Sequence, residues 1–182
     1  MIARRVALIF PVAIEGPAVN KPLNVLFLCT GNSSRSILAE AILNHRGKPN
    51  FRAFSAGSHP AGRVHPYALK QLESAGLPVE GLWSKSWDEF AKPGAPQMDF
   101  VITVCDAAAA EVCPVWPGKP HTAHWGIPDP GNLGKTPEEL TRAFFDAFVT
   151  LGRRIDLFLS LPFEKLDALA LKKEITRIGR ES

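Results

Sequence analysis

The sequence predicts an α/β fold: a doubly wound, four-stranded parallel sheet flanked by helices. Apolar, strand-like runs alternate with helical segments along the chain, the pattern of parallel strands joined by right-handed crossovers. The 182 residues are enough for one domain with a full hydrophobic core. The first apolar run, Leu23 to Leu28, ends in a loop rich in Gly, Asn and Ser before a helical stretch begins.

Four segments have the composition of strands, and in chain order they are residues 23–28, 51–55, 99–104 and 121–125. Doubly wound sheets bind ligands outside the carboxyl ends of their strands. Cys29 follows the first strand, Cys105 ends the third, and Asp129 follows the fourth. We therefore expect these three side chains, which lie far apart in sequence, to meet at one edge of the sheet.

The predicted helices cover residues 36–45, 66–75, 86–90, 106–113 and 137–159. The longest begins after Thr136, with Glu139 three residues on, which is the spacing of a capping box. The tail, residues 163–182, is helical in composition and rich in Lys and Arg. For this basic helical tail we expect a solvated face.

The main domain is predicted to cover residues 23–162, and residues 1–22 are expected to be a non-essential extension. Two arginines and an apolar run near the start faintly resemble a secretory signal, but Pro11 interrupts the run and no cleavage site follows closely. No apolar run approaches the ~20 residues that span a bilayer, so we expect no membrane partner.

The composition narrows the possible partners and the compartment. A net charge of +3 mildly favours anionic ligands and is too weak to indicate nucleic acid. The three cysteines, an odd and low number, favour reduced thiols in the cytoplasm over a disulfide framework. Their spacing matches no zinc site, so no metal is expected.

No role is assigned to the loop and strand histidines His59, His65, His121 and His124.

The loop after the first strand is the predicted oxyanion site, formed by Cys29, Thr30, Gly31, Asn32, Ser33, Ser34, Arg35 and Ser36. A strand that turns through such a loop into a helix directs backbone N–H groups and the positive helix end into one concavity. Arg35 adds a planar fork suited to a tetrahedral oxyanion. Cys29 is the predicted nucleophile, with its pKa lowered by the loop amides, Arg35 and Ser36.

Asp129 lies between two prolines, which hold its carboxylate stiffly. One interpretation is a general acid that protonates the oxygen leaving the group attacked by Cys29. The other is an Asx-turn residue that only caps its own loop. The expected position at the same sheet edge as Cys29 favours the catalytic interpretation.

The loop Cys29–Ser36, the triplet Ser55–Gly57, the strand DFVITV that leads into Cys105 and the segment HWGIPDP resemble one group of proteins. These are the low-molecular-weight tyrosine phosphatases and the thioredoxin-coupled arsenate reductases, which share a fold. The resemblance covers about residues 23–160. It implies either hydrolysis of phosphate esters through a phosphocysteine at Cys29, or reduction of arsenate in arsenic detoxification. A third possibility is a module that binds oxyanions or senses oxidation without catalysis.

For a reductase, the resemblance implies a relay of three thiols and no bound cofactor. Cys29 attacks arsenate, Cys105 attacks Cys29 and releases arsenite, and Cys113 attacks Cys105. Thioredoxin or glutaredoxin then reduces the Cys105–Cys113 disulfide, while phosphate or sulfate would compete with arsenate. Because reduction takes two electrons, the three cysteines favour the reductase. Eight helical residues span ~12 Å and a disulfide needs Cα atoms within ~7 Å, so we expect residues 106–112 to unwind on oxidation.

Two positions depart from the resemblance. Phosphatases of the group carry aromatic residues just after the acid loop, whereas Gly131 and Asn132 stand here, which disfavours an aryl phosphate. Some reductases of the group bind potassium beneath the loop. Asn32, Glu40 and Ser55 match three positions of that site, but the fourth position, which is acidic in those reductases, falls at Lys85 here. We expect the Lys85 ammonium to replace the ion; the alternative is an ordinary exposed lysine.

Overall fold

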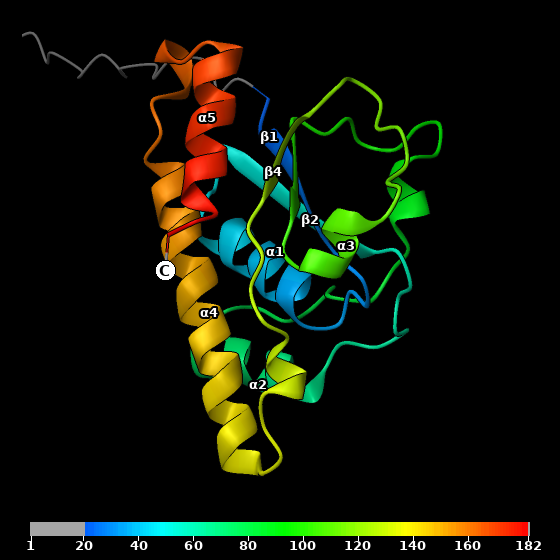
Figure 1. The fold of residues 1–182 in the computed structure, drawn as a ribbon, viewed down its shortest axis with the longest axis vertical. Helices are drawn as coiled ribbons and strands as arrows, with labels where there is room; N and C mark the ends of the chain where they lie inside the picture. The colour runs from blue at the N-terminus through cyan, green and yellow to red at the C-terminus, as the bar shows by residue number, and fades with distance from the viewer. Residues whose placement is uncertain (1–20, 182) are drawn as a thin grey trace, which may run out of the picture.

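A computed structural model describes residues 21–181 and confirms the predicted α/β architecture (Figure 1). One parallel sheet contains β1 (Leu23–Cys29), β2 (Phe51–Gly57), β3 (Phe100–Thr103) and β4 (His121–His124), in the order β2-β1-β3-β4. The strand order reverses between β1 and β3, so the crevice that binds ligands in such sheets lies where β1 ends. The predicted extension, residues 1–22, lies outside the described residues except for its last two.

The strand register brings three carboxyl ends to one level. Cys29 lies opposite Gly57 of β2, Leu28 lies opposite Thr103 of β3, and Thr103 lies opposite His124 of β4. Residues that follow β1, β3 and β4 therefore leave the sheet side by side. This register puts the segments that carry Cys29, Cys105 and Asp129 at the same edge.

The helices are α1 (Arg35–Arg46), α2 (Pro66–Ser74), α3 (Asp106–Ala110), α4 (Pro137–Leu159) and α5 (Ala168–Ile178). Three 3₁₀ turns cover Trp87–Phe90, Pro130–Asn132 and Phe163–Lys165. The predicted capping box opens α4, because Thr136 Oγ1 accepts from the Glu139 N–H at 3.2 Å and the Glu139 carboxylate accepts from the Thr136 N–H at 3.2 Å. Within residues 21–181, none of the helices is both long and apolar enough to cross a membrane.

The two faces of the sheet are covered unequally. On one face, α1, α4 and α5 pack over a large core that includes Phe27, Ile102 and Phe158 (Figure 1). The other face carries a smaller cluster, in which Val101 packs with Trp116 and the 3₁₀ turn after Ser86. The chain segment that carries Cys113 and Trp116 therefore lies on the more thinly covered face.

The basic residues of the tail lie on a solvated face as expected, but α5 also has a buried face. In α5 the side chains of Leu171, Ile175 and Ile178 are buried, and the Trp125 indole N–H donates to the Ile175 carbonyl at 2.8 Å. These apolar residues recur at helical spacing, which produces one buried stripe beneath the charged face. The Lys and Arg content therefore indicates the solvated face of α5 but not this stripe.

Ile175→Ala should lower the free energy of unfolding by about 2–5 kcal/mol, because it opens a cavity where α5 meets the core. The matched control is Leu169→Ala on the same helix, where the side chain is 80% exposed and the expected change is within ~0.5 kcal/mol. Urea denaturation measures both. Equal, small effects would mean that α5 does not stabilise the domain.

Candidate functional site

The loop after β1 surrounds the Cys29 sulfur. Its Sγ accepts the Asn32 N–H at 3.2 Å and lies 2.9 Å from the Ser36 hydroxyl, and the residue is only 2% exposed. Asn32 has a φ of 42°, a left-handed conformation that asparagine tolerates well. A Cβ at Gly57 would come within 2.4 Å of the Thr30 carbonyl, so glycine lets the end of β2 support the loop closely. A buried thiol thus lies at the base of a tight loop.

Arg35, the first residue of α1, spans the mouth of this loop toward Asp129. Its guanidinium donates to the Asp129 carboxylate and to the Ile127 carbonyl, each at 3.1 Å. The other Asp129 oxygen accepts from the Gly131 N–H at 3.0 Å. The carboxylate therefore caps its own turn and faces the loop at the same time, so the two interpretations of Asp129 are compatible.

The pKa of Cys29 does not follow the sequence expectation. Burial raises the pKa of the thiol, and hydrogen bonds with Ser36 and Asn32 oppose this rise without outweighing it. The expectation of a lowered pKa is wrong for this geometry, and the position of Arg35 gives a physical reason. Its positive charge is paired with Asp129, which leaves less of it to stabilise a thiolate. An anion bound in the loop would compete with Asp129 for this guanidinium.

Cys105 lies beside the same loop. Its sulfur is 3.6 Å from the Thr30 hydroxyl, and its charge is among the causes that raise the pKa of Cys29. The Cys105 Sγ also caps α3, because it accepts the Ala108 N–H at 3.4 Å. The structure thus brings the second cysteine to the rim of the loop that holds the first.

Cys113 is half-buried and lies three residues beyond the end of α3. It lines a hollow of about 510 Å³ together with His124 and Lys172, and burial, followed by the charge of Glu111, raises its pKa. The predicted helix at 106–113 ends at Ala110, so the last three residues need no unwinding. All three cysteines are free thiols. Rearrangement of the five residues of α3 on oxidation stays a prediction.

Lys85 is buried beneath the loop, so the alternative of an exposed lysine is wrong. Its side chain is 6% exposed, and its Nζ lies 3.5 Å from the Glu40 carboxylate and 3.5 Å from the Ser55 hydroxyl. Ser55 donates to Glu40 and accepts from the Asn32 amide at 2.9 Å. The backbone N–H of Lys85 donates to the Asn32 side chain at 2.8 Å. Contacts therefore connect this ammonium to the residue that turns the loop.

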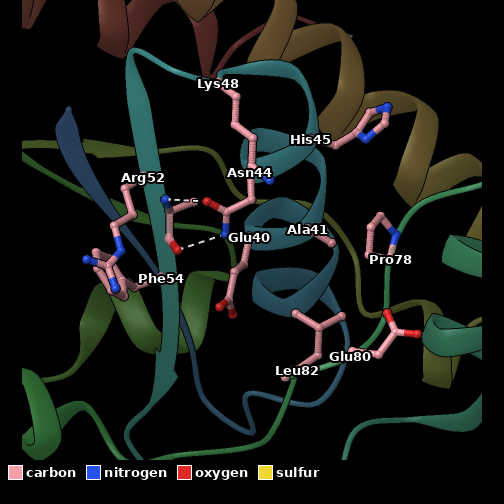
Figure 2. Close-up of a pocket in the computed structure, with 12 residues that line it drawn as sticks. Glu40, Ala41, Asn44, His45, Lys48, Arg52, Phe54, Pro78, Glu80 and Leu82 are labelled. Carbon is pink, nitrogen blue, oxygen red and sulfur yellow. Dashed lines mark hydrogen bonds between the residues drawn. The ribbon is translucent and has the colours of Figure 1, made fainter. Parts of the chain in front are cut away.

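The Lys85–Glu40 pair balances burial against charge. Burial raises the pKa of the Glu40 carboxyl and lowers that of the Lys85 ammonium, and the attraction between the two charges opposes both shifts. Glu40 also lines a cavity of about 410 Å³. Figure 2 shows its side chain there near Asn44, which makes two hydrogen bonds with the backbone of Ala53. Cys29 does not line this cavity, so it is distinct from the oxyanion loop.

Of the four histidines without an assigned role, two act in packing and capping, and two contact carboxylates. His65 caps α2, and His121 stacks on Phe100. His59 Nδ1 lies 3.9 Å from the Glu111 carboxylate, and His124 Nε2 lies 2.9 Å from the Asp106 carboxylate, contacts that no local sequence signal indicated. Across residues 21–181, no group of three or more His, Cys, Asp or Glu side chains is placed to hold a metal ion.

Lys85→Met should lower the free energy of unfolding by about 3–5 kcal/mol, because it leaves a buried carboxylate without its cation. Adding Glu40→Gln in the same chain should recover much of that loss, and urea denaturation measures both variants.

Potassium and sodium chloride at equal ionic strength should give the wild type the same melting temperature. A rise specific to potassium would contradict replacement of the ion by Lys85.

Asp129→Asn should lower the pKa of Cys29, because Arg35 loses its counter-charge and becomes free to stabilise the thiolate. The measurement is the pH dependence of Cys29 alkylation by iodoacetamide, with the other two cysteines changed to serine. Asp146→Asn, at an exposed position on α4, is the matched control. If the pH midpoint of Cys29 alkylation stays at its wild-type value, the Arg35–Asp129 pair does not control the pKa of this thiol.

Comparisons with known proteins agree with the loop and the sheet. Residues 24–157 match the family described as "Low molecular weight phosphotyrosine protein phosphatase". An arsenate reductase of Halalkalibacterium halodurans is 34% identical over 134 residues, which are 74% of this chain and 93% of that protein. Helix α5 lies beyond the matched residues.

Two solved structures show the same architecture. The thioredoxin-dependent arsenate reductase of Corynebacterium glutamicum superimposes with a TM-score of 0.52 at 26% identity, over 78% of this chain and 65% of that one. The low molecular weight protein tyrosine phosphatase of T. tengcongensis gives a TM-score of 0.62 at 23% identity, over 79% and 99%, and shows the shared fold. The chain belongs to the low molecular weight phosphotyrosine protein phosphatase family.

Proposed function

We propose that this protein is an arsenate reductase, which converts arsenate to arsenite with electrons from its own thiols. The observation that carries the proposal is the Cys105 sulfur, 3.6 Å from the Thr30 hydroxyl at the rim of the loop that holds Cys29. Hydrolysis of a phosphate ester needs one thiol, whereas reduction takes two electrons and hence a second thiol close by. The naming of relatives such as the H. halodurans protein as arsenate reductases supports the same conclusion.

Arsenate binding is assigned to the loop of the β1–α1 connection, with contacts from Thr30, Gly31, Asn32, Ser33, Ser34, Arg35 and Ser36. Backbone N–H groups and the start of α1 attract the anion. Arg35 exchanges part of its contact with Asp129 for the arsenate oxygens. Phosphate and sulfate, which share the tetrahedral shape, compete for the loop.

The first chemical step joins sulfur to arsenic. The Cys29 thiolate attacks the arsenic atom, and an As–O bond breaks as its oxygen leaves as water. Asp129 takes up a proton from solvent once Arg35 has turned to arsenate, and it then acts as the general acid for this oxygen, because it lies at the mouth of the loop. The product is a covalent Cys29–arsenic intermediate with arsenic still in the +5 state.

Two thiol steps then carry the electrons. The Cys105 thiolate attacks the Cys29 sulfur, the S–As electron pair stays on arsenic, and arsenite leaves with arsenic in the +3 state. Cys113 attacks Cys105 in the resulting disulfide, which releases the Cys29 thiolate and leaves a Cys105–Cys113 disulfide. An external dithiol reduces this disulfide. The thioredoxin-dependent reductase of C. glutamicum supports thioredoxin as the electron donor, and glutaredoxin is the alternative. The three free thiols suit the reducing cytoplasm.

Phosphate ester hydrolysis is the second candidate. The same Cys29, Arg35 and Asp129 could cleave a phosphate ester and hydrolyse the phosphocysteine, and the fold is shared with a tyrosine phosphatase. Gly131 and Asn132 follow the acid loop here and offer no ring to sandwich a phosphotyrosine. This favours small phosphates over aryl esters if hydrolysis occurs.

The decisive assay couples arsenate to NADPH oxidation through thioredoxin and thioredoxin reductase. Wild type should turn over, whereas Cys105→Ser and Cys113→Ser should fall to background because each breaks the relay. Cys113→Ser should still release one equivalent of arsenite and stop at the Cys29–Cys105 disulfide, which mass spectrometry detects. Hydrolysis of p-nitrophenyl phosphate reports whether the loop is intact in each variant.

The assay also separates the alternatives. A phosphatase would hydrolyse a small alkyl phosphate or p-nitrophenyl phosphate at the same rate in both serine variants as in the wild type, and it would show no arsenate-dependent NADPH oxidation. An oxidation sensor would show neither activity. Replacing thioredoxin with glutathione and glutaredoxin identifies the donor.

A further inference from the structure

His124, the last residue of β4, holds the start of α3. Its Nε2 lies 2.9 Å from the carboxylate of Asp106, the first residue of α3, and its Nδ1 lies 2.8 Å from the hydroxyl of Thr103, the last residue of β3. A carboxylate only accepts hydrogen bonds, so Nε2 carries the hydrogen and donates to Asp106. The imidazole ring is thereby fixed between the sheet edge and the helix that follows Cys105.

The same pair lies against the segment that leads to Asp129. A Cβ at Gly126 would come within 2.4 Å of the Asp106 carboxylate and 2.5 Å of the His124 Nε2. Glycine at this position is what leaves room for the pair. The start of α3, the end of β4 and the beginning of the acid loop therefore meet at one contact.

Helix α3 depends on such contacts, because its five residues are far too few to be stable alone. Two side chains hold its first turn. The Cys105 sulfur accepts the Ala108 N–H at 3.4 Å, and Asp106 binds His124. When the Cys105 sulfur moves to form a disulfide, it gives up the first of these contacts. The His124–Asp106 contact then remains as the other of these two side-chain contacts on the turn.

We propose that His124 is a positioning residue for the thiol relay. With Asp106 it forms a latch, and opening of this latch limits transfer of the disulfide from Cys29–Cys105 to Cys105–Cys113. The proposal rests on the proposed function. In this step the Cys113 thiolate attacks the Cys105 sulfur, the bond to Cys29 breaks, and Cys29 leaves as a thiolate. The step is an exchange, so no further oxidant or reductant is needed.

The exposure of the pair suits a latch that must open. The side chain of Asp106 is 94% exposed and that of His124 is 43% exposed, so water can replace the contact. An exposed pair of this kind is weak compared with the buried Lys85–Glu40 pair. It holds the turn before oxidation without locking it.

The test is a single turnover with arsenate and no external dithiol, quenched with N-ethylmaleimide at successive times. Mass spectrometry of the peptides follows decay of the Cys29–Cys105 disulfide and growth of Cys105–Cys113. Asp106→Ala and His124→Ala should each speed this transfer, by up to about fivefold for an exposed pair. The double variant should be no faster than the single variants, because both remove the same contact. Asp146→Ala on α4 is the control.

Wild-type transfer rates in Asp106→Ala and His124→Ala would overturn the latch, and so would effects that multiply in the double variant. If arsenate produces no Cys29–Cys105 disulfide in the wild type, the proposed function fails. Amide hydrogen exchange then tests the latch separately. In the reduced protein, the amides of Ala108, Ala109 and Ala110 should exchange hydrogen faster in either variant by the same factor, with the melting temperature unchanged. Unchanged exchange at these amides would refute the latch independently of arsenate.

Discussion

The alignment of three parallel strand ends is the constraint on which the site depends. Leu28, Thr103 and His124 lie side by side across β1, β3 and β4, so the chain leaves the sheet three times at one level. The oxyanion loop, the start of α3 and the acid loop are the three segments that leave there. A shift in this register would separate the sulfurs, whatever their sequence context.

Two ion pairs lie on opposite sides of the loop and serve different purposes. Lys85 and Glu40 are buried, so their charges rely on each other, and through Ser55 and Asn32 they support the backbone turn. Arg35 and Asp129 are more accessible, and their contact can be exchanged for an anion. The first pair supports the turn of the loop, whereas in the proposed function the second gives up its contact so that Arg35 can bind arsenate. This difference follows from burial rather than from residue type.

Sequence patterns predicted the elements well where the signal was local. The run before Cys29, the Thr136–Glu139 capping box and the start of α2 at residue 66 each appear in the structure as expected. Errors arose where packing decided. The charge of the tail hid the buried stripe of α5, and the helix after Cys105 ends at Ala110, before Glu111 and Val112. The His124–Asp106 contact joins residues 18 apart and could not be predicted from either neighbourhood.

The sequence by itself determined the nature of the chemistry: a cysteine and an arginine on a Gly, Asn and Ser loop between a strand and a helix favour oxyanions in any such fold. Only the tertiary structure decided how the charges are distributed. Burial raises the pKa of Cys29 while Asp129 takes up the charge of Arg35, and Lys85 is enclosed with Glu40. Local patterns determine which groups are available, whereas desolvation and distance depend on residues that meet only after folding.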